Sequence, residues 1–163
     1  MLRLASYDIV FQEIPGEVTL ALNISGCPNR CPGCHSPHLW ENIGEALDET
    51  MIQYLLDTYG NAVTCVCVMG GDADPQEVGR LAGYIKSISS GSLRTGWYSG
   101  KAALPAGYSV ENFDYIKLGP YIERLGGLDS PGTNQRLYKV NQRDMVNITL
   151  SFGRIGKSGS ELS

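Results

Sequence analysis

The sequence predicts an α/β fold with a mostly parallel sheet, arranged as a partial, open barrel. Strand-like and helix-like segments alternate between residues 18 and 118, which is typical of parallel strands joined by helical crossovers. Residues 63–69 are apolar at nearly every position, as expected of a parallel strand covered on both faces. A complete barrel of eight strand–helix units needs roughly 200 residues or more, so a chain of 163 residues can form only part of one.

The first expected elements are a strand and a helix. Residues 18–25 alternate between larger apolar and smaller or polar side chains, which is the pattern of a strand with one buried face, and Gly26 ends it. A helix is expected over residues 49–59, with Asp48 as its N-cap and Gly60 after its last turn. The apolar stripe of this helix consists of Met51, Ile52, Leu55, Leu56 and Tyr59.

The next elements are separated by glycine and proline. The expected strand at 63–69 ends at Gly70-Gly71. A second helix then begins, because Asp74 can cap it, Pro75 suits its first position and Glu77 completes a capping box. Further strands are expected at residues 93–98, 115–118 and 146–152.

The composition favours one domain and excludes several classes of function. We expect a single domain over residues 1–153 and a flexible tail rich in Gly, Ser and Lys over 154–163. The formal net charge is -4, so nucleic acid is not an expected partner. No apolar run approaches the ~20 residues that cross a bilayer, and no secretory signal begins the sequence, so we expect no membrane association and a cytoplasmic location.

Three cysteines form the most informative motif. Cys27, Cys31 and Cys34 have C-x3-C-x2-C spacing and follow the first expected strand. Cysteine thiolates are the usual ligands of iron–sulfur clusters, and three of them would leave one iron of a [4Fe-4S] cluster open to substrate. The other two cysteines, Cys65 and Cys67, lie within an expected buried strand, so we interpret them as core residues.

Other interpretations of the cysteine motif remain open. Cys31, Cys34 and His35 match the c-type haem attachment string, but this attachment requires export, for which the sequence has no signal. Zinc could be bound by the three cysteines with His35 or His38, although all these donors lie on one short segment. A thioredoxin-like redox pair would leave Cys27 without a role.

The motifs together resemble those of the radical S-adenosylmethionine (SAM) enzymes, in which C-x3-C-x2-C follows a strand. The resemblance narrows to the glycyl-radical activating enzymes, specifically those that serve anaerobic ribonucleoside-triphosphate reductases. It extends over about residues 7 to 140 and implies a single radical SAM domain with a partial, open barrel of the radical SAM type. The segments that carry it are 26–35, Trp40, 70–72 and 133–136.

The resemblance implies an activity, cofactors and partners. Cys27, Cys31 and Cys34 would hold a [4Fe-4S] cluster that reductively cleaves SAM, and the resulting 5'-deoxyadenosyl radical would abstract hydrogen from a backbone glycine. The implied partners are the large reductase subunit, whose glycine loop is the substrate, and a flavodoxin-type electron donor. No side chain is implied as acid, base or nucleophile. The alternatives are an activase of another glycyl-radical enzyme or of a peptide, and a small zinc-binding interaction module.

The resemblance also implies a SAM site. Gly33, Cys34 and His35 would border the adenine. Gly70 and Gly71 would let the backbone approach the ligand closely, and Asp72 would accept hydrogen bonds from the SAM ammonium group.

Later positions complete the expected site. Ser99 and Lys117 follow or end strands, so we expect them at the ligand-binding edge of a parallel sheet. Lys117 could bind the SAM carboxylate or a surface acid, and Leu118 stands where the family usually has an acid before Gly-Pro. Turn formation and partner docking both remain open for Asn134, Gln135 and Arg136.

Overall fold

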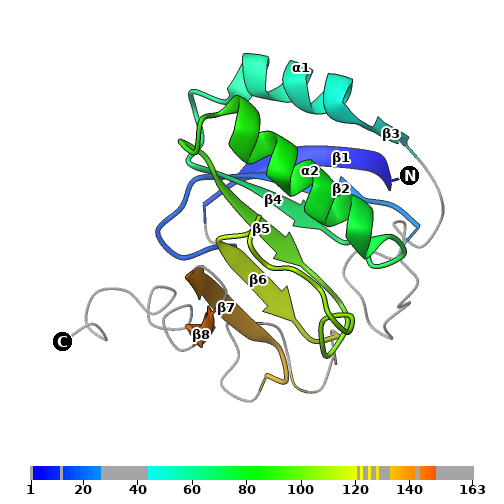
Figure 1. The fold of residues 1–163 in the computed structure, drawn as a ribbon, viewed down its shortest axis with the longest axis vertical. Helices are drawn as coiled ribbons and strands as arrows, with labels where there is room; N and C mark the ends of the chain where they lie inside the picture. Colours follow the sequence, from blue (N-terminus) through cyan, green and yellow to red (C-terminus); the bar gives the residue numbers. More distant parts are fainter. Residues whose placement is uncertain are drawn as a thin grey trace.

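The computed structural model describes residues 2–11, 13–26, 44–120, 122, 125, 128, 133–141 and 144–149. Within these residues, eight strands form one sheet, accompanied by two helices (Figure 1). The strands are β1 Leu2–Val10, β2 Thr19–Ile24, β3 Glu45–Leu47, β4 Cys65–Met69, β5 Arg94–Tyr98, β6 Tyr115–Leu118, β7 Arg136–Asn141 and β8 Asp144–Asn147, and the helices are α1 Glu49–Tyr59 and α2 Pro75–Ile88.

The sheet is mixed. Its order is β3-β1-β2-β4-β5-β6-β7-β8, and the four central strands β2, β4, β5 and β6 are parallel. The outer pairings, which join β1 to β2 and β3, and β7 to β6 and β8, are antiparallel. Parallel pairing is therefore confined to the strands whose sequence patterns were recognisable, and all four of these strands end at the same edge of the sheet.

Most of the expected central elements lie where the sequence places them. Strands at 18–25, 63–69, 93–98 and 115–118 correspond to β2, β4, β5 and β6. The expected late strand at 146–152 is displaced, because β8 ends at Asn147. Residues 150–152 of that prediction, and the expected tail at 154–163, lie outside the described residues.

The helix caps confirm the sequence-based boundaries. The Asp48 side chain accepts a hydrogen bond from the Met51 backbone N–H at 2.9 Å, which caps α1. The Asp74 side chain accepts one from the Glu77 backbone N–H at 3.3 Å, with Pro75 as the first residue of α2. Each cap binds a backbone donor that has no partner within its helix.

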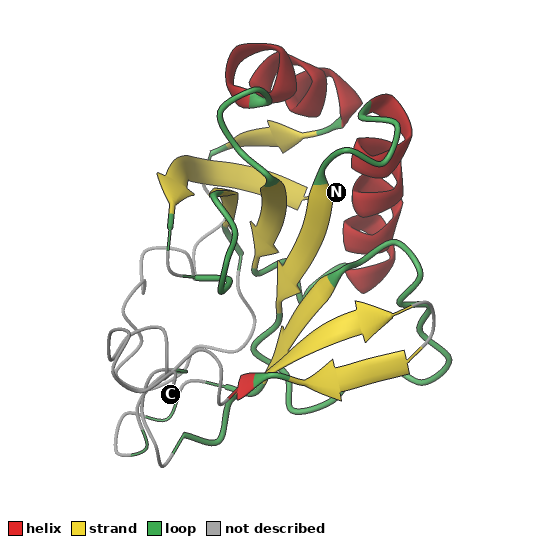
Figure 2. Cartoon of the chain, turned by 90° about the vertical axis from the view of Figure 1, so that its left-hand side faces the viewer, coloured by secondary structure: helices red, strands yellow, loops and turns green. Residues whose placement is uncertain are grey.

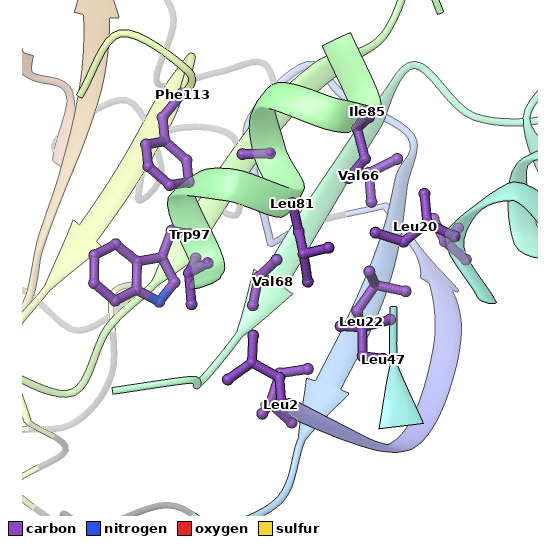
Figure 3. Packing of buried hydrophobic residues seen from close by; sticks show 14 of the residues in the cluster. Leu2, Leu20, Leu22, Leu47, Val66, Val68, Leu81, Ile85, Trp97 and Phe113 are labelled. Carbon is purple, nitrogen blue, oxygen red and sulfur yellow. The ribbon is translucent and has the colours of Figure 1, made fainter. Parts of the chain in front are cut away.

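Both helices cover the same face of the sheet (Figure 2). Alternate residues of the central strands point toward the helices and form the main core with the apolar faces of α1 and α2 (Figure 3). Burial of apolar surface of this kind is the dominant favourable contribution to folding. Members of this core include Leu20, Leu22, Val66, Val68, Leu81, Ile85, Trp97 and Ile116.

A smaller apolar cluster lies on the face without helices. Cys65 and Cys67 belong to it and are both fully buried, which confirms their interpretation as core residues. Burial raises the pKa of both thiols, so they stay protonated at neutral pH. Ile14, Tyr115 and Leu137 pack in the same cluster.

A buried carboxylate connects the amino ends of the central strands. Glu17 accepts hydrogen bonds from the hydroxyl groups of Thr64 at 2.6 Å and Tyr115 at 2.8 Å, and Arg94 Nε lies 3.4 Å from it. Burial and the hydrogen bond with Glu17 both raise the pKa of Tyr115. This edge is thus joined by structural contacts, while the expected site residues that the structure describes, namely Gly70, Gly71, Asp72, Ser99 and Lys117, lie at or beyond the opposite ends of the strands.

Candidate functional site

The candidate site lies where the four parallel strands end. Gly26, Gly70 and Gly119 follow β2, β4 and β6, and their φ angles are +72°, +107° and +117°. These angles lie in the left-handed region that favours glycine. In open α/β sheets, ligands bind at this carboxyl edge, because loops that leave adjacent parallel strands meet there.

The structure describes the two ends of the segment that carries the cysteine motif. The Ser25 backbone N–H donates to the Arg3 carbonyl oxygen at 3.0 Å, and Arg3 Nη1 donates to the Gly44 carbonyl oxygen at 3.0 Å. A Cβ at Gly44 would lie 2.1 Å from the Leu4 carbonyl oxygen, so only glycine fits there. Strand β1 therefore holds both ends of residues 27–43. The expected site residues Cys27, Cys31, Gly33, Cys34 and His35, together with His38 and Trp40, lie outside the described residues.

The Gly-Gly-Asp turn lies beside the end of β2. Gly70 donates its backbone N–H to the Tyr98 carbonyl oxygen at 3.0 Å, and a Cβ on Gly70 would lie 3.3 Å from the Ile24 carbonyl oxygen. Gly71 has a φ of +84°, and its carbonyl oxygen accepts the backbone N–H of Asp74 at 3.0 Å. The structure thus brings the expected residue Gly70 next to the strand from which the cysteine segment begins, and Gly71 against Val78 and Leu2.

Asp72 is buried, with an exposed fraction of 9%. Its carboxylate accepts hydrogen bonds from the Ser99 hydroxyl at 2.5 Å and from the Gly100 backbone N–H at 2.8 Å. Both partners follow β5, the strand next to the one that ends before Asp72. Hydrogen bonds to a carboxylate are stronger than neutral ones, so these contacts fix the position of the charge.

A pocket opens beside Asp72. Its volume is about 390 Å³, and its lining is more apolar than polar. The pocket lies between the first turn of α2 and the loop after β5, and the size is within the range of small-molecule sites. Its lining residues include Asp72, Pro75, Trp97, Ser99, Lys101 and Leu104.

Lys117 lies on the face of the sheet without helices. Its side chain is buried, with an exposed fraction of 8%, and its Nζ donates to the Gly119 carbonyl oxygen at 3.2 Å. The same Nζ lies 5.6 Å from the centroid of the Tyr98 ring, which is a cation–π distance. Lys117 therefore lies at the expected edge, with its charge held close to the ends of β5 and β6.

Residues 133–136 lead into β7 and lie against the end of β6. Asn134 Nδ2 donates to the Pro120 carbonyl oxygen at 2.9 Å, and Gln135 Nε2 lies 3.4 Å from the Gly119 carbonyl oxygen. Arg136 Nη1 donates to the Thr133 carbonyl oxygen at 2.5 Å. Asn134 and Gln135 thus bind backbone groups that follow β6, Arg136 begins β7, and the turn and docking roles considered for these residues stay predictions.

Sequence reasoning missed two residues that shape this site. Trp97 donates its indole N–H to the Gly70 carbonyl oxygen at 2.6 Å, and Arg3 holds the ends of the cysteine segment. A buried tryptophan within an expected strand is a usable signal, because its N–H needs an acceptor. No local pattern distinguishes Arg3 from any other exposed strand residue.

Replacing Ser99 with alanine is expected to lower the free energy of unfolding by about 1 to 2 kcal/mol, because the buried Asp72 carboxylate loses a donor. Urea unfolding of the anaerobic protein measures this change. Ser109→Ala is the matched control, since Ser109 is exposed and the same substitution there should change stability by no more than about 0.5 kcal/mol. Equal losses of stability from the two substitutions would show that the hydrogen bond from Ser99 to Asp72 does not stabilise the fold.

No helix within the described ranges has the length and apolar character needed to cross a membrane. Those ranges also hold no group of three or more His, Cys, Asp or Glu side chains suited to a metal ion, whereas three cysteines occur in residues 27–34.

Comparisons with known proteins identify the family. No curated protein matches the sequence. Residues 15–105, more than half of the chain, match the model of a family described as a 4Fe-4S single cluster domain. This range includes the cysteine motif, the Gly-Gly-Asp turn and Ser99, and the chain therefore belongs to the 4Fe-4S single cluster domain family.

Proposed function

We propose that the chain is a radical SAM activase that reductively cleaves SAM and generates a glycyl radical on the large subunit of an anaerobic ribonucleoside-triphosphate reductase. The observation that carries the proposal is the position of the Gly-Gly-Asp turn. Gly70 lies against Ile24 at the end of β2, three residues before the first residue of the C-x3-C-x2-C segment. A zinc-binding module would need the cysteines but gives no reason for a left-handed glycine pair and a buried acid after β4.

The donor set fits a [4Fe-4S] cluster with one open iron. In this proposal Cys27, Cys31 and Cys34 hold the cluster, and a bound, reduced cluster supplies the electron that cleaves the sulfonium C–S bond of SAM. Gly33, Cys34 and His35 are proposed to border the adenine.

The described residues are proposed to hold the rest of SAM. Asp72 accepts hydrogen bonds in a fixed position and would accept further ones from the SAM ammonium group, because a carboxylate offers about four lone-pair sites. Lys117 supplies a buried positive charge at the same edge, suited to the SAM carboxylate. Ser99 positions Asp72, and Gly70 and Gly71 keep side-chain atoms away from the ligand.

The sheet supports an open version of the radical SAM barrel. Four parallel strands, with helices on one face only, form its described centre. We propose that this arrangement leaves one side accessible to the glycine loop of a large reductase subunit, with a flavodoxin-type protein as electron donor and the cytoplasm as location.

The experiment that tests the proposed function begins with anaerobic reconstitution of the full chain. Iron and sulfide are measured, the visible spectrum is recorded, and SAM is added with dithionite. We expect about four irons per chain and release of methionine and 5'-deoxyadenosine. A colourless protein with one zinc, or an iron protein that leaves SAM intact, would refute the activase.

The identity of the target requires a second measurement. Incubation of the reconstituted protein with SAM, reductant and a purified large reductase subunit is expected to produce the electron paramagnetic resonance signal of a glycyl radical. A reductase variant whose radical-bearing glycine is replaced by alanine is the control. Cleavage of SAM without this signal would assign the protein to a different glycyl-radical enzyme or to a peptide.

A further inference from the structure

Two neighbouring residues of β5 bind both polar backbone groups of Gly70. The indole Nε1 of Trp97 donates to the Gly70 carbonyl oxygen at 2.6 Å, and the Gly70 N–H donates to the Tyr98 carbonyl oxygen at 3.0 Å. The hydrogen bond from Gly70 to Tyr98 joins two backbone groups and continues the parallel pairing of β4 and β5. The hydrogen bond from Trp97 comes from a side chain. The position of the Gly70 carbonyl group is therefore set by the indole ring.

The indole ring is held in place by its surroundings. Trp97 is 1% exposed, and its ring centroid lies 5.9 Å from that of Phe113 and 5.4 Å from that of Tyr108. Figure 3 shows Trp97 and Phe113 side by side next to α2. The Tyr108 hydroxyl donates to the carbonyl oxygen of Pro75 at 2.6 Å, at the start of α2. The ring thus cannot turn away from Gly70 without disrupting this packing.

The contact matters because Gly70 precedes Asp72 by only two residues. Gly70 and Gly71 both have left-handed φ angles, so their backbones can adopt conformations that are closed to other residues. Ser99 and Gly100 hold the far end of this short turn through the Asp72 carboxylate. The Trp97 contact holds the near end.

We propose that Trp97 is a positioning residue that fixes the Gly70–Asp72 turn through its indole N–H and thereby aligns the Asp72 carboxylate with the ammonium group of SAM. The inference rests on the proposed function for its ligand, whereas its structural part concerns the turn alone. Trp97 itself has no role in the chemical step. Its loss should weaken ligand binding without slowing cleavage in the saturated enzyme.

The test replaces the indole N–H while preserving the shape of the ring. Benzothienylalanine, which has sulfur in place of the N–H group, is introduced at position 97 of the full chain, and Trp97→Phe is prepared as a second variant. Phe113→Leu is the matched control, because it loosens the same aromatic packing and keeps the indole N–H that donates to Gly70. All proteins are reconstituted anaerobically, and their iron contents are required to agree.

Two readouts are measured. The dissociation constant and KM for SAM are expected to rise about five- to tenfold in the position 97 variants, as for the loss of one buried hydrogen bond, with kcat changed by a factor of no more than about two. Hydrogen exchange of the Asp74 and Gly100 amides, which donate to the Gly71 carbonyl and the Asp72 carboxylate, should become faster by a similar factor. The Val140 amide, which donates to Asp114, should be unchanged.

The outcomes separate this inference from the proposed function. If the wild-type chain binds and cleaves SAM but the benzothienylalanine variant has the same KM and the same exchange at Asp74 and Gly100, the inference is overturned. A rise in KM for Phe113→Leu without one for the benzothienylalanine variant would also overturn it, because packing alone would then explain the effect. If the wild-type chain fails to bind SAM, the proposed function and the ligand part of the inference are refuted, and unchanged exchange at the turn would refute the structural part as well.

Discussion

Cys31→Ser protein is expected to lose the cluster and to release 5'-deoxyadenosine only at the background rate. A [4Fe-4S] cluster with an open iron uses three thiolates, so serine at position 31 leaves two and exposes the cluster to loss. The variant should be nearly colourless after anaerobic reconstitution, while its far-ultraviolet circular dichroism should match that of the wild type. Iron content, the visible spectrum and product analysis by mass spectrometry provide the measurements.

Cys67→Ala is the matched control for this experiment. Cys67 is fully buried in the smaller apolar cluster, and burial raises the pKa of its thiol. Because its side chain is enclosed in this apolar cluster, we expect that Cys67 is not a ligand. The control should keep about four irons and full SAM cleavage, with a loss of stability of about 1 kcal/mol from the small cavity. Cleavage of SAM by Cys31→Ser protein, or loss of the cluster in Cys67→Ala protein, would rule out the proposed ligand set.

Gly71→Ala is expected to lower the free energy of unfolding by about 2 to 4 kcal/mol. One part, about 1 kcal/mol, arises because Gly71 has a φ of +84°, where a side chain is disfavoured. The other part, about 1 to 3 kcal/mol, arises from overpacking. A Cβ at this position would lie 2.6 Å from Cγ2 of Val78, a fully buried residue of α2. Urea denaturation of the anaerobic protein measures the total.

Two further variants separate these contributions. Gly91 has a φ of +76°, and a Cβ added there would have no neighbouring atom within 4 Å, so Gly91→Ala should show the backbone contribution alone. Val78→Ala removes the atom that clashes. In a double-mutant cycle, the variant with both substitutions should lose less stability, by about 1 kcal/mol or more, than the sum of the losses in the two single variants. Additive effects of Gly71→Ala and Val78→Ala would show that the turn moves away from α2 and that its position is not fixed by packing.

The elements with strong local signals could be predicted from the sequence. The Asp74-Pro75 start of α2 needed only capping chemistry, and β6 was recognisable as a short apolar run. Strand β1 was missed because its alternation is interrupted by a register shift between Leu4 and Ser6. Strand β3 has three residues, which is too short for any periodic pattern, and exposed Arg136 and Lys139 obscure the apolar residues of β7.

The candidate site shows the same division between local and long-range information. Gly70, Gly71 and Asp72 could be selected because a glycine pair followed by an acid stands between a strand and a helix cap. Their contacts with Trp97 and Ser99 could not be predicted, because these partners are 27 residues away and meet only through the parallel register of β4 and β5. A sequence pattern indicates which residues are unusual, whereas the pairing of strands determines which of them touch.

The double role of Arg3 has a consequence for how a metal centre can be assembled. Its carbonyl oxygen accepts a hydrogen bond from Ser25 and its guanidinium group donates one to Gly44, so the two ends of the intervening segment are joined through one residue. The entropy lost on joining the ends of such a segment is part of folding and is already lost before iron binds. Three thiols on a segment whose ends are joined have a higher effective concentration for one another than the same thiols on a peptide with free ends. The protein should therefore chelate iron as a macrocycle does, and a synthetic peptide of residues 25–44 should release it more readily.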